Sequence, residues 1–459
     1  MSKSKVAVGI APSNLLQNDV MTLSEALVKQ WKIPSAQPIT LKFGSFRKQM
    51  RIIPAEKQHV LKLNPVIAEM LGFQRQASMK HFMHLKYTAY NTTLELGPLI
   101  GILVSKEHPD IPDNPFGAIT PFCKEVAEAC RIQGGQVFFF TPNHLNNNPA
   151  SIQGWTYLDG WNRCRMPLPH VIYNRLTTRK LENLPSVQQF LQYTVHHNQT
   201  TVFNEKFLDK TEVFSALMTN RSVNHYLPES RPLRSFATLK TMSAKYNTLF
   251  VKPVTGSMGK GIIRIINDQQ SNYHAQHATS SGSRTQQFTS LQKLYSHLFS
   301  KKTNRYQIQQ GLQLIEIQKR PVDFRALVQK NKLGEWSVTS ILARIAGSQH
   351  FVSNLARGGS LCKVEEAVSR SNIMGRISSS DVSNRLRQAA LLIAQGIENG
   401  IEGHFGELGI DFALDRYGRI WMLEVNSKPS KNDNIPWQEG KIRPSVRKLI
   451  AYSKYLAQF

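Results

Sequence analysis

The chain has 459 residues, of which 41% are hydrophobic and 19% are charged, a composition typical of folded globular proteins and not of disordered ones. Its 57 Lys and Arg residues against 31 Asp and Glu give a net charge of +26, and such a surface attracts polyanions or acidic proteins. The sequence contains no RNP, C2H2 or basic-zipper pattern, so we do not expect nucleic acid as the partner.

Membrane, secreted and zinc-binding classes are also not expected. No run approaches the roughly 18 apolar residues that a membrane span needs. The start, MSKSKVAVGIAPSNLLQ, has a short apolar stretch without a cleavage pattern, so we expect no signal peptide and folding in a cytosol. The histidines lack metal-binding spacing, and no CxxC pair occurs among the scattered cysteines, which are Cys123, Cys130, Cys164 and Cys362.

Residues 1–93 are predicted to form a basic, mainly β module. In PITLKFGSFRKQMRIIP, the residues Ile39, Leu41 and Phe43 alternate with polar ones, as in a half-buried strand. Lys and Arg outnumber Asp and Glu in this segment, so the positive charge of the chain is not confined to one binding site.

Residues 94–205 are predicted to form a small α/β domain. GPLIGILVS indicates an apolar strand, PFCKEVAEACRIQGG a helix that ends in glycines, and QVFFFTP a second buried strand. Together they predict a β-α-β unit. The extended PHVIYNR and the helix-like QQFLQYTVHH complete this domain.

The remaining segment, 206–459, contains FVKPVTGSMGKGI at residues 250–262. Gly256 and Gly261 have P-loop spacing but are followed by Ile262 and Ile263, which excludes a P-loop and favours a second strand over a helix. The stretch therefore predicts strand, glycine loop, strand. The backbone N–H groups of such a loop can cover a polyphosphate, and Lys252 on the first strand supplies a point charge. A plain structural hairpin is the alternative.

A second hairpin is predicted in GELGIDFALDRYGRIWMLEVN, where two alternating strands flank DRYGR. A turn centred between Tyr417 and Gly418 fixes the register. In that register the opposed pairs are Asp411 with Glu424, Ala413 with Met422, and Gly409 with Asn426.

Asp411, Glu424 and Asn426 would then share one face of the hairpin. Opposed carboxylates repel each other, and a bound cation removes that repulsion. Carboxylate and amide oxygens suit a hard ion, most often Mg²⁺ shared with nucleotide phosphates. The alternative is a solvated strand face with incidental acids.

With these motifs, the chain from about residue 206 to its end resembles an ATP-grasp domain. More closely, it resembles the YheC/YheD-type endospore coat-associated proteins of spore-forming bacilli. The matching stretches are NEKFLDK, LPES, VKPVTGSMGKGI, YQIQQGL, RPVDFRALVQKN, ARIAGSQHFVSNLARGGS and GIDFALDRYGRIWMLEVNSKPS. The resemblance implies an α/β (α+β) protein: an ATP-grasp domain at 206–459, after a pre-ATP-grasp-like domain at 94–205 and the β module at 1–93.

The resemblance also implies sites for ATP and Mg²⁺. Asp411, Glu424 and Asn426 would hold the metal, and Arg344 and Asn354 would act near the γ-phosphate or an acyl phosphate, where positive charge assists most. Two lysines would contact the phosphates, a glycine loop would cover them, and a backbone segment would meet the adenine edge. This nucleotide-binding set is Lys210, Lys252, Gly256, Ser257, Met258, Gly259, Gly261, Gln309, Gln310, Gly311, Leu312 and Arg325.

Three observations qualify these assignments. Lys210 could instead be a surface residue at a helix N-terminus, and Asp323 with Arg325 could be a simple ion pair on a strand. Several ATP-grasp ligases place an arginine two residues before the metal-binding Asp, whereas this sequence has Gly409 there. That departure moves the acyl-phosphate role onto Arg344.

In ATP-grasp enzymes two sheet-bearing subdomains clamp ATP, and an amine displaces phosphate from an acyl phosphate. The resemblance therefore implies an ATP-dependent carboxylate-amine ligase that acts on a peptide or spore coat component, in the mother-cell cytoplasm or the coat. The alternative is a catalytically inactive coat protein that uses the fold for binding or assembly and docks on acidic peptides or coat proteins.

Overall fold

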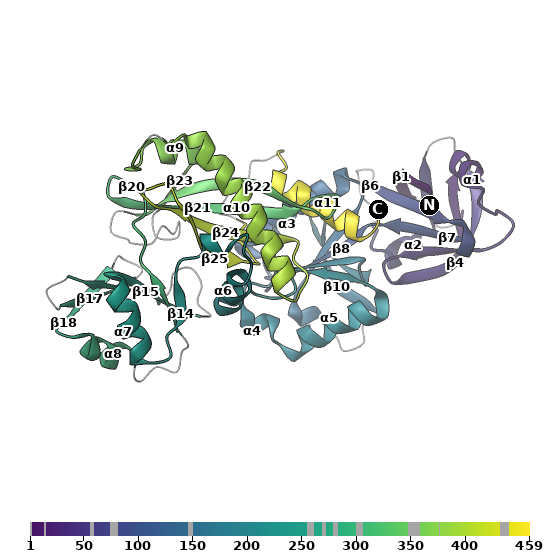
Figure 1. The fold of residues 1–459 in the computed structure, drawn as a ribbon. Coiled ribbons are helices and arrows are strands. Elements are labelled where there is room, and N and C mark those ends of the chain that lie inside the picture. The colour runs from purple at the N-terminus through teal and green to yellow at the C-terminus, as the bar shows by residue number, and fades with distance from the viewer. Residues whose placement is uncertain are drawn as a thin grey trace.

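The computed structural model describes residues 2–12, 15–55, 59–73, 81–145, 150–254, 261–268, 272–278, 283–299, 306–347, 359–375, 377–431 and 440–459. Within these ranges the chain forms a closed barrel and three open sheets, which follow one another from the N-terminal end of the molecule (Figure 1).

The N-terminal segment is a closed barrel with the strand order β1-β5-β2-β4-β3-β7-β6. Ile39, Leu41 and Phe43 all point into its core, which confirms the predicted alternation. Strand β7 (Thr93–Gly97) belongs to the barrel. The barrel therefore extends past residue 93, where the sequence predicted that the first module ends. Its elements are β1 (Ser2–Ile10), β2 (Val20–Ser24), α1 (Glu25–Trp31), β3 (Ile39–Phe43), β4 (Phe46–Ala55), β5 (Val60–Leu63), α2 (Pro65–Met70), β6 (His81–Thr88) and β7 (Thr93–Gly97).

The middle sheet has the order β11-β10-β9-β8-β12-β13, and the predicted β-α-β unit is confirmed as β8-α3-β9 with parallel strands. Phe138 and Phe140 pack into the core shared with the barrel, while Phe139 packs on the opposite face, which explains the unbroken apolar run. The elements are β8 (Leu99–Leu103), α3 (Thr120–Ile132), β9 (Gln136–Phe140), β10 (Ser151–Tyr157), β11 (Trp161–Pro167), β12 (Val171–Asn174), α4 (Arg179–Glu182), α5 (Pro185–Asn198) and β13 (Thr201–Phe203).

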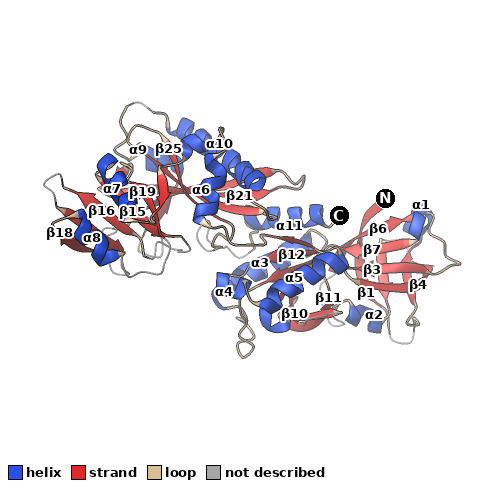
Figure 2. Ribbon diagram, turned by 60° about the horizontal axis from the view of Figure 1, so that its bottom comes forward, coloured by secondary structure: helices blue, strands red, loops and turns tan. Residues whose placement is uncertain are grey.

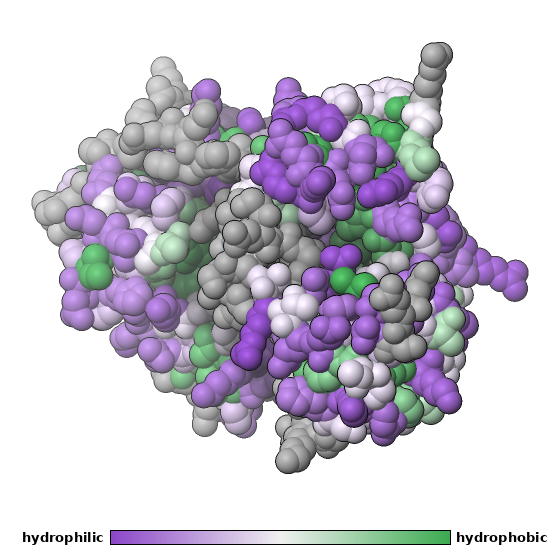
Figure 3. Space-filling view, turned by 90° about the vertical axis from the view of Figure 1, so that its left-hand side faces the viewer, coloured by the Kyte–Doolittle hydropathy of each residue, from purple (hydrophilic) through white to green (hydrophobic). Residues whose placement is uncertain are grey.

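The small sheet has the order β14-β19-β15-β16-β17-β18, and α7 and α8 supply apolar residues to its core. β15 and β16 pair antiparallel, so the predicted strand, loop, strand arrangement is confirmed. The elements are β14 (Ser230–Pro232), α7 (Phe236–Lys245), β15 (Thr248–Pro253), β16 (Ile263–Asn267), β17 (Tyr273–Ala278), β18 (Ser283–Phe288), α8 (Leu291–Leu298) and β19 (Tyr306–Gln310). Seen from this end, the surface is mainly hydrophilic, with hydrophobic residues in separate groups (Figure 3).

The large sheet has the order β23-β22-β21-β24-β25, with β20 paired to β21. Even-numbered residues such as Phe324 and Phe412 face the core formed with α6, α9 and α10, so the odd-numbered residues of β21 and β24 lie on the opposite face. Its elements are α6 (Lys210–Met218), β20 (Glu316–Ile317), β21 (Arg320–Lys330), β22 (Trp336–Ile345), β23 (Ser360–Cys362), α9 (Val364–Ser369), α10 (Ser379–Gly400), β24 (Glu407–Leu414) and β25 (Ile420–Asn426).

The final helix, α11 (Pro444–Leu456), returns to the middle sheet (Figure 2). Val446, Leu449 and Ile450 pack into the same core as α3 and Phe139. The segment 206–459, assigned from the sequence to one domain, thus contributes its last helix to the core of the preceding one. In the described ranges, no helix is both long and apolar enough to cross a membrane.

Candidate functional site

The β24–β25 hairpin carries the predicted oxygen ligands in register. Asp411 lies opposite Glu424, and Gly409 lies opposite Asn426, as predicted. The third predicted pair is wrong, because the register shifts by one residue and brings Met422 opposite Phe412. Residues two apart on a regular strand share a face, so Met422 would lie on the same face as Glu424. The register shift turns Met422 to the other face, into the core formed with the helices.

Asp411 is held by two arginines from the same sheet. Arg325 lies opposite it on β21 and binds both of its carboxylate oxygens, with Nη2 2.9 Å from Oδ2. Arg344 on β22 donates to Asp323 through Nε and Nη2, at 2.5 and 2.8 Å, and its Nη2 lies 3.2 Å from Asp411 Oδ1. The alternative ion pair between Asp323 and Arg325 therefore does not form, because their partners lie on neighbouring strands.

The paired charges control the protonation of this cluster. Burial alone raises the pKa of Asp411, but Arg325 and Arg344 outweigh burial and hold that pKa below its ordinary value. Burial likewise lowers the pKa of Arg344, yet Asp411 and Asp323 raise it above the usual value. Asp411 is thus a carboxylate whose negative charge is fixed by two guanidinium groups.

Two lysines approach Glu424 from different parts of the chain. Lys210 is the first residue of α6, and its Nζ lies 3.5 Å from Glu424 Oε1 with 15% of the side chain exposed, so it is more than a surface residue. Lys252 comes from β15 of the small sheet. Burial lowers the pKa of Lys252 to about 8, against the opposing effect of Glu424. Helix α6 and strand β15 therefore bring cations to one carboxylate.

The segment Gln309–Leu312 lies at the end of β19, next to Lys252. Gln309 accepts a hydrogen bond from Lys252 Nζ at 2.5 Å and donates to Ser230 Oγ at 2.9 Å. The backbone N–H groups of Gln310 and Gly311 donate to the carbonyls of Glu229 and Thr248. Those two N–H groups are therefore already used within the sheet.

The rest of the predicted nucleotide and catalytic set is only partly described. Gly261 lies just before β16 with a φ of 74°. The remaining predicted residues lie outside the described part of the chain, and they are Gly256, Ser257, Met258, Gly259 and Asn354.

Gly409 leaves space in the cluster, and the structure shows that Arg325 lies beside it. A Cβ at this position would lie 3.2 Å from Arg325 Nη1 and 2.8 Å from Pro429 Cβ. The missing side chain therefore leaves room for the guanidinium of Arg325. The sequence has no arginine two residues before Asp411. The pairing of β21 with β24 instead places Arg325 of the neighbouring strand beside this position.

The charges of the cluster suit a metal together with phosphates. Its four cations (Lys210, Lys252, Arg325 and Arg344) exceed its three carboxylates (Asp323, Asp411 and Glu424). The oxygen donors of the hairpin fit Mg²⁺, but each carboxylate already faces a protein cation. The described residues contain no group of three or more His, Cys, Asp or Glu placed to hold a metal.

The four cysteines are free thiols, and burial raises the pKa of each.

A second polar cluster on the same face of β24 was missed by sequence reasoning. Glu407 accepts hydrogen bonds from Tyr173 Oη at 2.9 Å and Gln329 Nε2 at 2.8 Å, and its oxygens lie 2.5 and 2.6 Å from Lys431 Nζ. These partners come from the middle sheet, from β21 and from the loop after β25. No local sequence signal connects residues so far apart in the chain.

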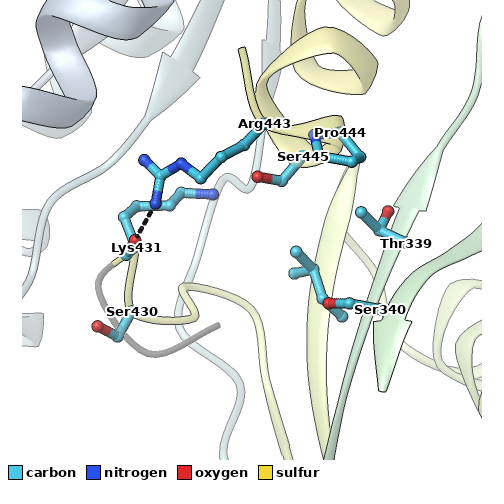
Figure 4. Close-up of a pocket in the computed structure, with 8 residues that line it drawn as sticks. Thr339, Ser340, Ser430, Lys431, Arg443, Pro444 and Ser445 are labelled. Carbon is cyan, nitrogen blue, oxygen red and sulfur yellow. Dashed lines mark hydrogen bonds between the residues drawn. The ribbon is translucent and has the colours of Figure 1, made fainter. Parts of the chain in front are cut away.

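A small recess lies beside this cluster (Figure 4). Arg443 donates to the carbonyl of Lys431 at 2.8 Å on one side, and Thr339 and Ser340 of β22 form the other. Leu327, one of its lining residues, is opposite Gly409, which places the recess between the rows of Asp411 and Glu407. The lining residues are Leu327, Thr339, Ser340, Ser430, Lys431, Arg443, Pro444 and Ser445.

The chain is similar to several known proteins. The family model "YheC/D like ATP-grasp" matches residues 199–456. Endospore coat-associated protein YheD of Bacillus subtilis (strain 168) is 29% identical over 393 residues, which are 85% of this chain and 84% of that protein. YheC of the same organism is 22% identical over 321 residues, 68% of this chain and 85% of YheC. The structure of ATP-grasp ligase PsnB with minimal precursor has a TM-score of 0.44 at 14% identity, covering 78% of this chain and 99% of that one.

Proposed function

Because the chain belongs to the YheC/D like ATP-grasp family, as its sequence motifs predicted, we propose that it binds ATP with Mg²⁺ and acts as an ATP-dependent carboxylate-amine ligase. The observation that carries this proposal is the row of Asp411, Glu424 and Asn426 in register on one hairpin, beside cations from two facing sheets. This charge excess favours a polyphosphate.

The position of each residue suggests its role in the proposed reaction. Lys210 and Lys252 would bind nucleotide phosphates under the glycine loop, and Asp411, Glu424 and Asn426 would hold Mg²⁺. Arg325 and Arg344 are already fixed by carboxylates and need no reorganisation to stabilise charge that develops on a transferred phosphoryl group. ATP held there would supply the phosphoryl group to a substrate carboxylate with release of ADP, and an amine would then displace phosphate from the resulting acyl phosphate.

The remaining assignments follow from the same placement. The adenine edge would meet backbone groups of Gln309–Leu312 other than the N–H groups of Gln310 and Gly311, which donate within the sheet. Asn354 would assist Arg344 at the acyl phosphate. We place the protein in the mother-cell cytoplasm or the spore coat, on a peptide or coat component, since both curated relatives are named endospore coat-associated proteins.

Thermal unfolding with and without saturating Mg-ATP tests the site. A ligand at about 100 times its Kd adds roughly 2.7 kcal/mol, and each kcal/mol raises Tm by about 2–4 °C, so the wild type should shift by several degrees. Glu424→Ala should not shift, whereas the exposed Glu402→Ala should behave as wild type. Mg²⁺ alone should have no effect, because protein cations already face the carboxylates. An equal shift in Glu424→Ala would refute the site.

A coat protein without turnover is the second candidate, and the net charge of +26 together with the names of the relatives favours it. It predicts association with coat material that weakens with salt and is indifferent to Asp411→Asn. The ligase predicts release of ADP that requires both a carboxylate and an amine and disappears in Glu424→Ala. Measuring ADP release across candidate acceptors separates the two.

A further inference from the structure

Arg175 lies where the parallel strands of the middle sheet end. The connection from β8 leads through α3 to β9 on one side, while β12 leads through α4 and α5 to β13 on the other. Ligands of open α/β sheets bind outside the carboxyl ends of strands at such a reversal. Arg175 directly follows β12, and its N–H donates to the carbonyl of Leu103 at the end of β8.

The Nε atom of Arg175 is buried without a hydrogen-bond partner. The residue is only 4% exposed. In the described part of the chain, no carboxylate or carbonyl accepts a hydrogen bond from this side chain. A largely buried cation without a counterion is unfavourable, so this position favours binding of an anion.

The neighbouring carboxylates cannot supply that anion, because each already has a cation. Glu182 pairs with Lys428, Glu407 with Lys431, and Glu125 with Arg443. Arg175 is the fourth cation beside these three pairs. Arg175 lies close to Lys428 and Lys431, because burial and repulsion by Arg175 both contribute to lowering the pKa of each lysine to about 8.

We propose that Arg175 binds an oxyanion, a carboxylate or phosphate group, of a substrate that carries two acidic groups. The planar guanidinium matches such a group through two parallel hydrogen bonds. The anion site itself does not depend on the proposed ligase function. The claim that the anion is part of a substrate rests on that proposed function.

The distance to the Asp411 cluster suggests the size of that substrate. Tyr173, two residues before Arg175, donates to Glu407, and Glu407 is four residues from Asp411, about 13 Å along the strand. The recess of Figure 4 occupies the row between them. An acidic peptide held at Arg175 would have to span at least this distance to present a second carboxylate at Asp411 for activation.

Unfolding midpoints of the full chain test this inference with sodium succinate, sodium phosphate and sodium chloride at equal ionic strength. Succinate or phosphate should raise the wild-type midpoint above the chloride value, and Arg175→Met should abolish this rise. A response to succinate alone identifies a carboxylate site, and a response to phosphate alone a phosphate site. In chloride, Arg175→Met should unfold at or above the wild-type temperature, because it removes an uncompensated charge.

Two matched variants set the scale. Arg443→Met leaves Glu125 unpaired and should unfold several degrees lower, whereas the exposed Arg165→Met should match wild type throughout. The proposal is overturned if Arg175→Met is destabilised as Arg443→Met is, or if succinate and phosphate affect wild type and Arg175→Met equally or not at all. Arg175→Met should keep the thermal shift with Mg-ATP, because Arg175 is not part of the proposed nucleotide site. If the wild type itself shows no shift with Mg-ATP, the proposed ligase function is refuted and the anion site is not.

Discussion

Asp411 and Glu407 lie four residues apart on the same face of β24, and both are buried carboxylates bound by cations. Glu407 is closed in by Lys431, Tyr173 and Gln329, which join three parts of the chain. Asp411 instead lies in a row where cations outnumber carboxylates. The comparison teaches that a buried ion pair alone does not mark a site; an excess of one charge does, because only a ligand can balance it.

The largest expected effect is at Glu407. Glu407→Gln leaves Lys431 buried without a counterion, which should lower the free energy of unfolding by about 3–5 kcal/mol. Urea unfolding measures this loss, with the exposed Glu402→Gln as the control. The Mg-ATP shift should survive in the variant. A variant that keeps its stability but loses nucleotide binding would reverse the roles assigned to the two carboxylates.

Asp411→Asn should lower the free energy of unfolding less than Glu407→Gln does, but it should abolish Mg-ATP binding. Its amide still accepts a hydrogen bond, and Asp323 still neutralises Arg344, so we expect a loss of about 1–3 kcal/mol. The thermal shift with Mg-ATP should disappear, since a metal ligand and its charge are lost. Asp381→Asn, an exposed partner of Arg385 on α10, should leave both properties unchanged. Retained Mg-ATP binding in Asp411→Asn would contradict the metal role.

The smallest expected effect concerns pH. Lys252 has a pKa of about 8, so it is charged and attracts phosphate below that pH and loses this attraction above it. Affinity for Mg-ATP should therefore fall between pH 7 and 9.5, by at most about tenfold per pH unit for one proton. Titrations should give a weaker and flatter profile for Lys252→Met, and the wild-type profile for the exposed Lys240→Met. Parallel profiles for wild type and Lys252→Met would exclude Lys252.

Local sequence patterns predicted the hairpins well and their long-range partners poorly. The period-two alternation around DRYGR gave the pairing of Asp411 with Glu424, because a short turn fixes the register of its own strands. The same reasoning missed the shift that turns Met422 inward, since that depends on the core beneath α10. It also left open an ion pair between Asp323 and Arg325, whereas strand order assigns each a partner on another strand.

The sequence by itself determined the family, most strand and helix types and the placement of Asp411, Glu424 and Asn426 on one hairpin, because motifs and alternation are properties of neighbouring residues. The tertiary structure decided which charges meet: Arg325 over Gly409, Lys252 with Glu424, and Glu407 with Lys431. It also left Nε of Arg175 buried without a hydrogen-bond partner. These pairings join residues tens to hundreds of positions apart, and only the packing of one sheet against another brings such residues within the few ångströms over which buried charges act.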